Sequence, residues 1–165
     1  MRRTVGIAWD ILTFWTRRFH PLGPPENSER AVPELSRRVK QLSRHDNARV
    51  MLTAHSQGSV IATASLASLA GAGERLDKLA FITLGNPTGR LYRSFFPGYF
   101  CGGLLRWIRA ELVDDDVWLN AHRLTDPIGD AIFTGPDEDL APPVRERISG
   151  DVVLWDPPSR WRFSR

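Results

Sequence analysis

The chain has 165 residues, of which 42% are hydrophobic and 25% are charged, and its net charge is +3. These values predict one globular domain over residues 1–165, large enough to bury a core, and argue against a disordered or fibrous protein. The basic residues are scattered and no aromatic side chains alternate with them, so we do not expect a nucleic-acid partner. An anionic membrane surface is the more plausible macromolecular partner.

The N-terminal region combines an apolar run, a loop and a helix. Residues 5–15 fit either a strand or the start of a buried helix, because their periodicity does not separate the two. Asp10 interrupts this run, no small-residue cleavage site follows it, and it is too short to span a bilayer. We therefore expect neither a signal peptide nor a transmembrane helix, and a location in the cytoplasm or at the inner membrane surface. Prolines predict a loop over residues 20–25, where we interpret His20 as structural. From Ser28, one apolar stripe predicts a helix, formed by Ala31, Val32, Leu35, Val39 and Leu42.

The segment from Arg49 to Ala70 has the pattern of a nucleophile elbow. A short apolar strand ends near Ala54, the chain turns at His55-Ser56, and an alanine-rich helix starts beyond Gly58. This is the order found around G-x-S-x-G, with Ala54 in place of the first glycine. Small residues at Ala54 and Gly58 are expected because strand and helix must pass closely, and the backbone N–H of Gln57 can face a developing oxyanion. The plainer alternative is that Ser56 only caps the helix.

The next apolar segments predict further strands. Residues 79–85 form a continuous apolar run, which is typical of a parallel strand buried on both faces. With the elbow strand and helix they make a βαβ unit. Residues 117–125 and 151–155 are the third and fourth strand candidates, and we interpret His122 as structural. The fold class is therefore α/β: a partial, three-layer α/β-hydrolase-like fold with a short and mostly parallel sheet.

Aromatic residues gather between residues 86 and 108. Phe95, Phe96, Tyr99 and Phe100 could line a pocket for an apolar ester, as a lid or acyl-binding wall, or could equally belong to a loop packed on the core. Cys101 is the only cysteine, so no intrachain disulfide can form, and we interpret it as a small core residue. We expect neither a metal nor a cofactor.

A serine nucleophile needs a base, usually a histidine oriented by a carboxylate. Ser56 and Asp126 supply nucleophile and acid in the order of α/β-hydrolases. Asp126 follows the third strand, Asp130 is an alternative acid, and residues 114–116 fit a solvated acidic turn. All four histidines precede Asp126 in the sequence, and the side chain of His55 should point away from the hydroxyl. We therefore expect negligible esterase activity from this chain alone.

Several segments together resemble the lipase-like α/β-hydrolase domain of large actinobacterial membrane-associated proteins. They are residues 10–15 (DILTFW), 20–21 (HP), 29–35 (ERAVPEL), 54–59 (AHSQGS), 91–97 (LYRSFFP) and 125–129 (TDPIG). The last is similar to the acid-bearing turn of class 3 lipases. The resemblance implies a nucleophile at Ser56, an acid at Asp126, and a histidine in an H-S-x-Y-W-like motif after a segment similar to residues 152–158. It further implies that this chain is truncated at both ends, because the motif, the earlier strands, the oxyanion loop and the transmembrane helices of that family are not in it.

Three interpretations remain open from the sequence. The first is a serine-hydrolase domain of esterase or lipase type. The second is a non-catalytic membrane-peripheral or protein-interaction module that keeps the fold. The third is the product of an incomplete reading frame that folds poorly, since few strands are visible. The sequence indicates neither a particular substrate nor an oligomeric state.

Overall fold

A computed structural model of the chain describes residues 27–45, 49–76, 78–112, 117–133 and 150–154. Its elements are α2 (Asn27–Ser43), β1 (Val50–His55), α3 (Gln57–Gly71), β2 (Leu79–Leu84), the π-helical turn η2 (Thr88–Tyr92), α4 (Arg93–Phe95), α5 (Gly102–Leu112), β3 (Trp118–His122) and β4 (Gly150–Val153). The predictions for residues 5–15, His20, the loop at 20–25 and the acidic turn at 114–116 lie outside the described residues.

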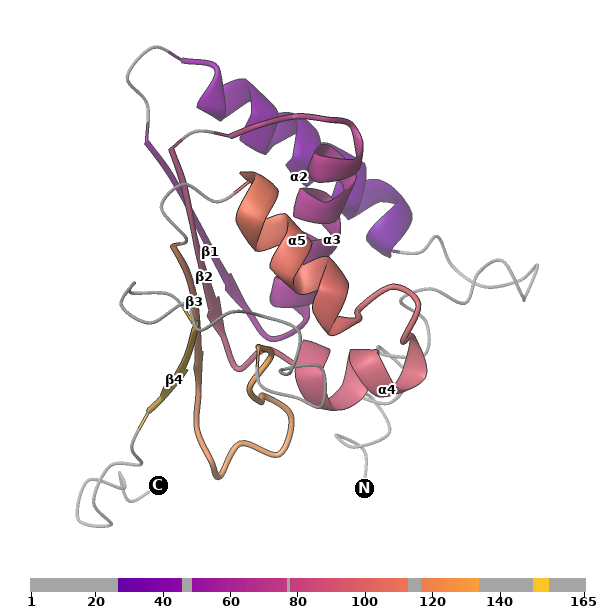
Figure 1. Cartoon of the computed structure of the whole chain (residues 1–165), viewed down its shortest axis with the longest axis vertical. Helices are drawn as coiled ribbons and strands as arrows, with labels where there is room; N and C mark the ends of the chain where they lie inside the picture. Colours follow the sequence, from indigo (N-terminus) through magenta and orange to yellow (C-terminus); the bar gives the residue numbers. More distant parts are fainter. Residues whose placement is uncertain (1–26, 46–48, 77, 113–116, 134–149, 155–165) are drawn as a thin grey trace.

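The four strands form one parallel sheet in the order β1-β2-β3-β4 (Figure 1). The register pairs His55 with Leu84, and Leu84 with Ala121. Because parallel strands run in the same direction, the residues that follow β1, β2 and β3 meet at one edge of the sheet. The partial α/β fold with a short parallel sheet, predicted from the apolar runs, is confirmed.

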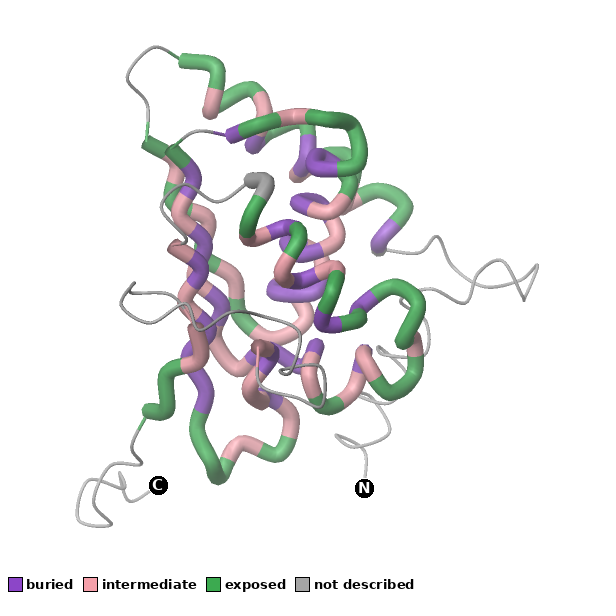
Figure 2. The backbone as a smooth tube through the Cα atoms, in the orientation of Figure 1, coloured by how far each residue is buried: buried purple, intermediate pink, exposed green. Residues whose placement is uncertain are grey.

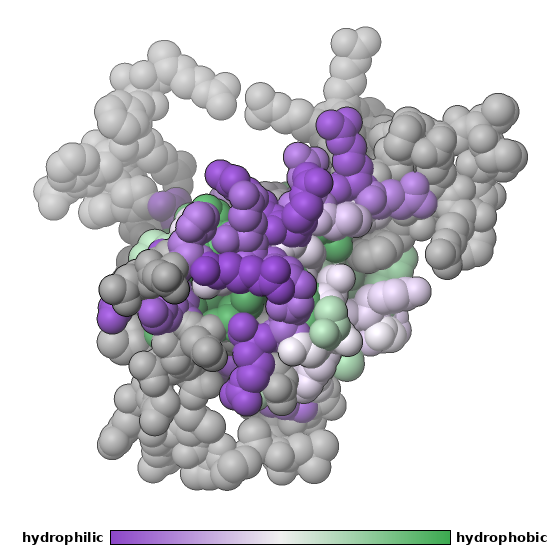
Figure 3. All heavy atoms as spheres, turned by 90° about the horizontal axis from the view of Figure 1, so that it is seen from above, coloured by the Kyte–Doolittle hydropathy of each residue, from purple (hydrophilic) through white to green (hydrophobic). Residues whose placement is uncertain are grey.

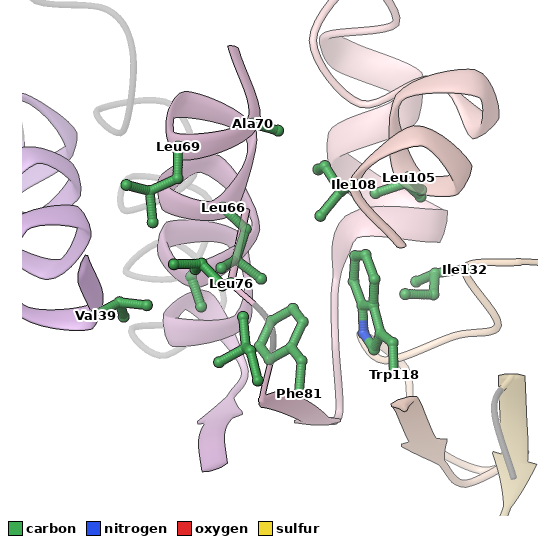
Figure 4. Packing of buried hydrophobic residues seen from close by; sticks show 12 residues of the cluster. Val39, Leu66, Leu69, Ala70, Leu76, Phe81, Leu105, Ile108, Trp118 and Ile132 are labelled. Atoms are coloured by element: carbon green, nitrogen blue, oxygen red, sulfur yellow. The ribbon is translucent and has the colours of Figure 1, made fainter. Parts of the chain in front are cut away.

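The core lies between the sheet and three helices. Val39 of α2, Leu66 of α3 and Ile108 of α5 pack in one cluster with Phe81 and Trp118 of the sheet (Figure 4). The rings of Phe81 and Trp118 lie 4.7 Å apart and are tilted by 42°. Since α2, α3 and α5 share this cluster, they cover the same face of the sheet, as Figure 1 shows.

The strand at the β1 edge is only half covered. Its residues alternate between partly buried and exposed along the whole strand (Figure 2). Val50, Leu52 and Ala54 pack against the core, whereas Met51 is 68% exposed. This period of two is typical of a strand with one covered face. The described residues therefore form two layers, the sheet and the helices on one of its faces.

Several boundaries differ from the predicted ones. The third strand ends at His122 rather than at residue 125, because a turn closes earlier through the Asp126 N–H, which donates to the Arg123 carbonyl at 3.0 Å. The fourth strand begins at Gly150 and ends at Val153. The helix predicted from Ser28 begins at Asn27.

Cys101 is not a core residue, so that interpretation is wrong. It is exposed and directly precedes α5. Its sulfur accepts a hydrogen bond from the Leu104 N–H at 3.4 Å. The first N–H groups of a helix lack carbonyl partners within it, so Cys101 serves this helix end instead of filling the core.

Candidate active site

Ser56 lies in the turn between β1 and α3 with a backbone that few side chains tolerate. Its φ and ψ angles are 52° and −128°, and it is the one non-glycine residue with positive φ in the described part of the chain. Both sides of the turn are held, because the Ser56 N–H donates to the Leu84 carbonyl at 3.0 Å and its carbonyl accepts from the Ser59 N–H at 2.9 Å. Such a conformation costs about 1–3 kcal/mol and persists only when the surroundings impose it.

The Ser56 side chain does not cap the helix that follows it. Ser56 occupies the N-cap position of α3, where a serine ordinarily accepts a hydrogen bond from a backbone N–H of the first turn. Here no side-chain cap hydrogen bond forms. Capping therefore does not account for a serine in this turn.

The small residues around Ser56 have unequal reasons to be small. Near Ala54 the helix is tied to the strand, because the Ser59 hydroxyl donates to the Ala54 carbonyl at 3.2 Å, and the need for a small side chain there stays a prediction. At Gly58 the predicted steric requirement is wrong, since a Cβ added there would have no described atom within 4 Å. Gln57 is the first residue of α3, whose N-terminus carries a partial positive charge and has no acidic residue in its first turn.

Asp126 sits in the loop after β3, at the same edge of the sheet. Its Oδ1 accepts a hydrogen bond from the Ile128 N–H at 2.9 Å. Arg90 approaches from η2 and donates to the Asp126 carbonyl at 3.1 Å, while its Nε lies 3.3 Å from a carboxylate oxygen of Asp130. Asp130, the alternative acid, is therefore engaged in an ion pair with Arg90.

The surroundings of Asp126 favour its ionised form. Burial raises the pKa of this carboxyl and is the largest single influence. The backbone N–H groups of Ile128 and Gly129, together with the charges of Arg90 and His55, outweigh it and hold the pKa below its ordinary value. Asp126 is therefore a carboxylate at neutral pH, as a residue that orients and stabilises an imidazolium must be.

Two glycines allow the loop to close over the end of β2. A Cβ on Gly129 would lie 2.6 Å from the Gly85 Cα and 2.7 Å from Asp126 Oδ2. A Cβ on Gly85, which has φ of 53°, would lie 3.2 Å from Asp126 Oδ2 and 3.6 Å from His55 Nε2. Gly85 therefore has both the carboxylate and the imidazole beside it.

The sequence missed this approach of His55 to Asp126. From the sequence we expect only that the His55 side chain points away from Ser56. In the structure His55 is the last residue of β1 and its side chain is exposed. The available signal was the glycine after the 79–84 strand, which leaves room for a neighbouring side chain. The structure thus brings Ser56, His55 and Asp126 to one edge of the sheet.

A polar network that the sequence analysis did not identify holds the loop beyond Asp126. Asp151 of β4 accepts hydrogen bonds from the Ile132 and Phe133 N–H groups, each at 2.9 Å, and from Asn120 Nδ2 at 2.6 Å. The Asn120 amide also donates to the Asp130 carbonyl at 2.9 Å. Three polar anchors from two strands therefore fix residues 130–133, which directly follow the Asp126 turn.

Three buried polar atoms in or after β2 and β3 lack partners among the described residues. Asn86 Nδ2, Thr88 Oγ1 and His122 Nδ1 are buried and make no hydrogen bond within the described structure. His122 is 6% exposed, and the hypothesis that it is structural stays a prediction.

The four aromatic residues predicted to line a pocket separate into two pairs. Phe100 is 2% exposed and packs with Val60 and Tyr92, whose ring lies 5.6 Å away, and Phe96 packs against the same cluster. Phe95 and Tyr99 are 62% and 61% exposed. Phe100 therefore belongs to the core, and only Phe95 and Tyr99 present large exposed rings.

Within the described ranges, no group of three His, Cys, Asp or Glu residues is placed to hold a metal ion. No helix in those ranges is both long and apolar enough to cross a membrane. No protein-family model matches the chain, and no curated protein matches it significantly.

Proposed function

We propose that this chain carries the reaction centre of a serine hydrolase of the esterase or lipase type, with Ser56 as nucleophile and Asp126 as acid. The observation that carries the proposal is the backbone of Ser56, with φ of 52° and ψ of −128° between a parallel strand and a helix. A serine whose strain is imposed by its neighbours, and whose hydroxyl does not cap the helix, has a conformation suited to nucleophilic attack.

The chemistry assigned to these residues is acyl transfer. The Ser56 oxygen attacks the carbonyl carbon of an ester, the hydroxyl proton passes to a base, and the negative charge develops on the carbonyl oxygen. Collapse of this intermediate breaks the ester C–O bond and expels the alcohol, which takes up the proton, and water then releases the acid from Ser56 by the same two steps. The Gln57 N–H, at the positive end of α3, is the donor we assign to that oxygen. The role of Asp126 is to orient and stabilise a protonated imidazole.

The proton acceptor determines how active the chain can be. No histidine follows Asp126 in the sequence, and His55 is the imidazole that lies beside its carboxylate in the described structure. A triad that lacks its base retains roughly 10³–10⁴-fold acceleration over water in a well-studied case. An oxyanion site that lacks one donor loses a further factor of about 10²–10³. Turnover by this chain alone is therefore expected to be very slow.

An apolar ester is the substrate class we assign. Phe95 and Tyr99 are large exposed rings in the segment that follows η2, and η2 contacts the Asp126 loop through Arg90. Aromatic side chains on a segment attached to the site are suited to contact an acyl chain.

The proposal is tested by incubating the wild-type chain with a fluorophosphonate and with a p-nitrophenyl ester, with and without added imidazole. We expect slow labelling that imidazole accelerates, because it can replace the missing base. Ser56→Ala should abolish labelling, whereas Ser68→Ala, an exposed serine of the same helix, should leave it unchanged. No labelling even with imidazole would favour a non-catalytic module, and fast ester turnover without imidazole would contradict the assignment of a missing base.

A further inference from the structure

A groove runs along α2 and reaches α3. It consists of two adjoining hollows of about 630 and 550 Å³ that share Arg37 and Gln41, so we call them together the α2 groove. It follows α2 from Ala31 to Arg44, a distance of about 20 Å at the rise of a helix. Ala31 and Leu35 of α2 and Ile61 of α3 give one hollow an apolar lining.

The charge of the α2 groove is concentrated at its centre. Arg37 and Arg38 are exposed and form no ion pair with any described residue. Arg38 makes one long hydrogen bond, 3.5 Å, to Gln41. These two guanidinium groups are therefore available to an external anion.

The remaining charges of the groove are partly compensated. Lys40 forms an ion pair with Glu74, and Arg44 lies 3.9 Å from the same carboxylate. Glu34 lines one hollow and lies 3.9 Å from Arg30. Lys40 and Arg44 together exceed the one carboxylate of Glu74 by one positive charge, and Arg37 and Arg38 add two more. Figure 3, which views the molecule from above the orientation of Figure 1, shows mostly hydrophilic side chains on the described part of that face, with apolar atoms between them.

We propose that the α2 groove binds the phosphate headgroups of an anionic membrane surface. Guanidinium groups bind phosphate through two parallel hydrogen bonds, and two adjacent arginines supply that geometry twice. The apolar lining next to them can accept the glycerol and upper acyl carbons of the same lipid. Among the described residues no aromatic ring lines either hollow, so they offer no stacking surface of the kind that single-stranded nucleic acids use.

The groove also reaches the helix that carries the candidate nucleophile. Ile61 lies in α3 five residues after Ser56, about 7.5 Å along the helix axis. A lipid surface held at Arg37 and Arg38 is therefore held by α2, which packs against α3. The groove proposal does not depend on Ser56 being a nucleophile.

The test is cosedimentation of the full chain with vesicles of phosphatidylcholine alone and of phosphatidylcholine with phosphatidylglycerol, at low and physiological salt. We expect binding only to the anionic vesicles, weakened by salt. Each arginine or lysine near such a surface contributes about a factor of five, so Arg37→Ser/Arg38→Ser should reduce partitioning roughly 30-fold. The matched control is Arg75→Ser/Lys78→Ser, which removes the same charge from exposed positions outside the groove.

The control should keep most of the binding, and circular dichroism should show both double variants folded. Equal losses in the two double variants would overturn the proposal, because general charge would then explain binding. An absence of binding to anionic vesicles would overturn it as well. Binding to a short duplex DNA in preference to the vesicles would assign the arginines to a nucleic acid instead. Retained binding by Ser56→Ala separates this proposal from the hydrolase proposal.

Discussion

Replacing Ser56 by glycine should stabilise the protein while removing the candidate nucleophile. The φ of 52° and ψ of −128° at Ser56 are unfavourable for any residue that carries a Cβ, whereas glycine adopts them readily. The serine side chain makes no cap hydrogen bond that the substitution would remove. Two contributions to the free energy of unfolding therefore remain to be compared. One is the backbone strain that glycine relieves in the folded state, and the other is the greater freedom of glycine in the unfolded chain.

These two contributions can be set side by side. Relief of backbone strain contributes about 1–3 kcal/mol. The greater entropy of unfolded glycine costs about 0.5–1 kcal/mol. The free energy of unfolding of Ser56→Gly should therefore exceed that of the wild type by about 1 kcal/mol, which corresponds to a Tm increase of about 3 °C for a chain of this size.

Ser56→Ala is the matched control because it also removes the hydroxyl but keeps the Cβ. Its stability should lie within about 0.5 kcal/mol of the wild type. The assay is equilibrium unfolding in urea followed by circular dichroism, with a thermal melt in parallel. The reasoning is refuted if Ser56→Gly is less stable than Ser56→Ala, since the turn would then hold no strain that glycine relieves.

Three further predictions concern the loop that carries Asp126. Gly129→Ala should lower the free energy of unfolding in urea by about 2–3 kcal/mol, because its Cβ would lie 2.6 Å from the Gly85 Cα. Gly58→Ala is the control: a Cβ there would have no described atom within 4 Å, so it should be neutral or stabilising by up to about 1 kcal/mol. Equal effects of the two substitutions would contradict the close approach. Asp151→Ala should cost about 3 kcal/mol or more, because three donors lose their acceptor, and a loss below about 1 kcal/mol would contradict the network. In the folded state the pKa of Asp126 is held below its ordinary value, so its charge stabilises the fold above about pH 4, and this contribution disappears as the pH falls through the lowered pKa. The stability difference between wild type and Asp126→Asn should accordingly shrink in acid, and the pKa of Asp126, measured by carboxyl NMR, should rise in His55→Gln.

The sequence predicts the parallel sheet because its first three strands lie in mainly apolar runs, although the ends of the third and fourth strands differ from the predicted ones. A βαβ unit is predicted by the elbow strand, the alanine-rich helix after Ser56 and the apolar run at residues 79–84. The structure has this unit, with β1 and β2 paired in parallel. The position of Ser56 between strand and helix follows from the same local pattern. Local patterns of this kind depend on neighbours in the sequence, which is why they can be predicted.

The contacts that position Asp126 could not be predicted, because they join residues far apart in the sequence. Asp151 holds the Ile132 and Phe133 N–H groups only because β4 pairs in register with β3. The approach of His55 to Asp126 likewise requires β1, β2 and β3 to be aligned. The exposed position of Cys101 was missed because free cysteines are usually buried. Here the sulfur instead accepts a hydrogen bond from the Leu104 N–H in the first turn of α5.

The most direct measurement of the central claim is the location of the covalent adduct formed by a fluorophosphonate in the presence of imidazole. The folded chain is digested after partial labelling, and the modified residue is identified by mass spectrometry. We predict that the phosphonyl group is found on Ser56, in preference to the exposed Ser68 and Ser94, and that prior unfolding in urea removes this preference. Modification spread over the exposed serines, or absent from Ser56, would contradict the claim that the turn between β1 and α3 presents a nucleophile.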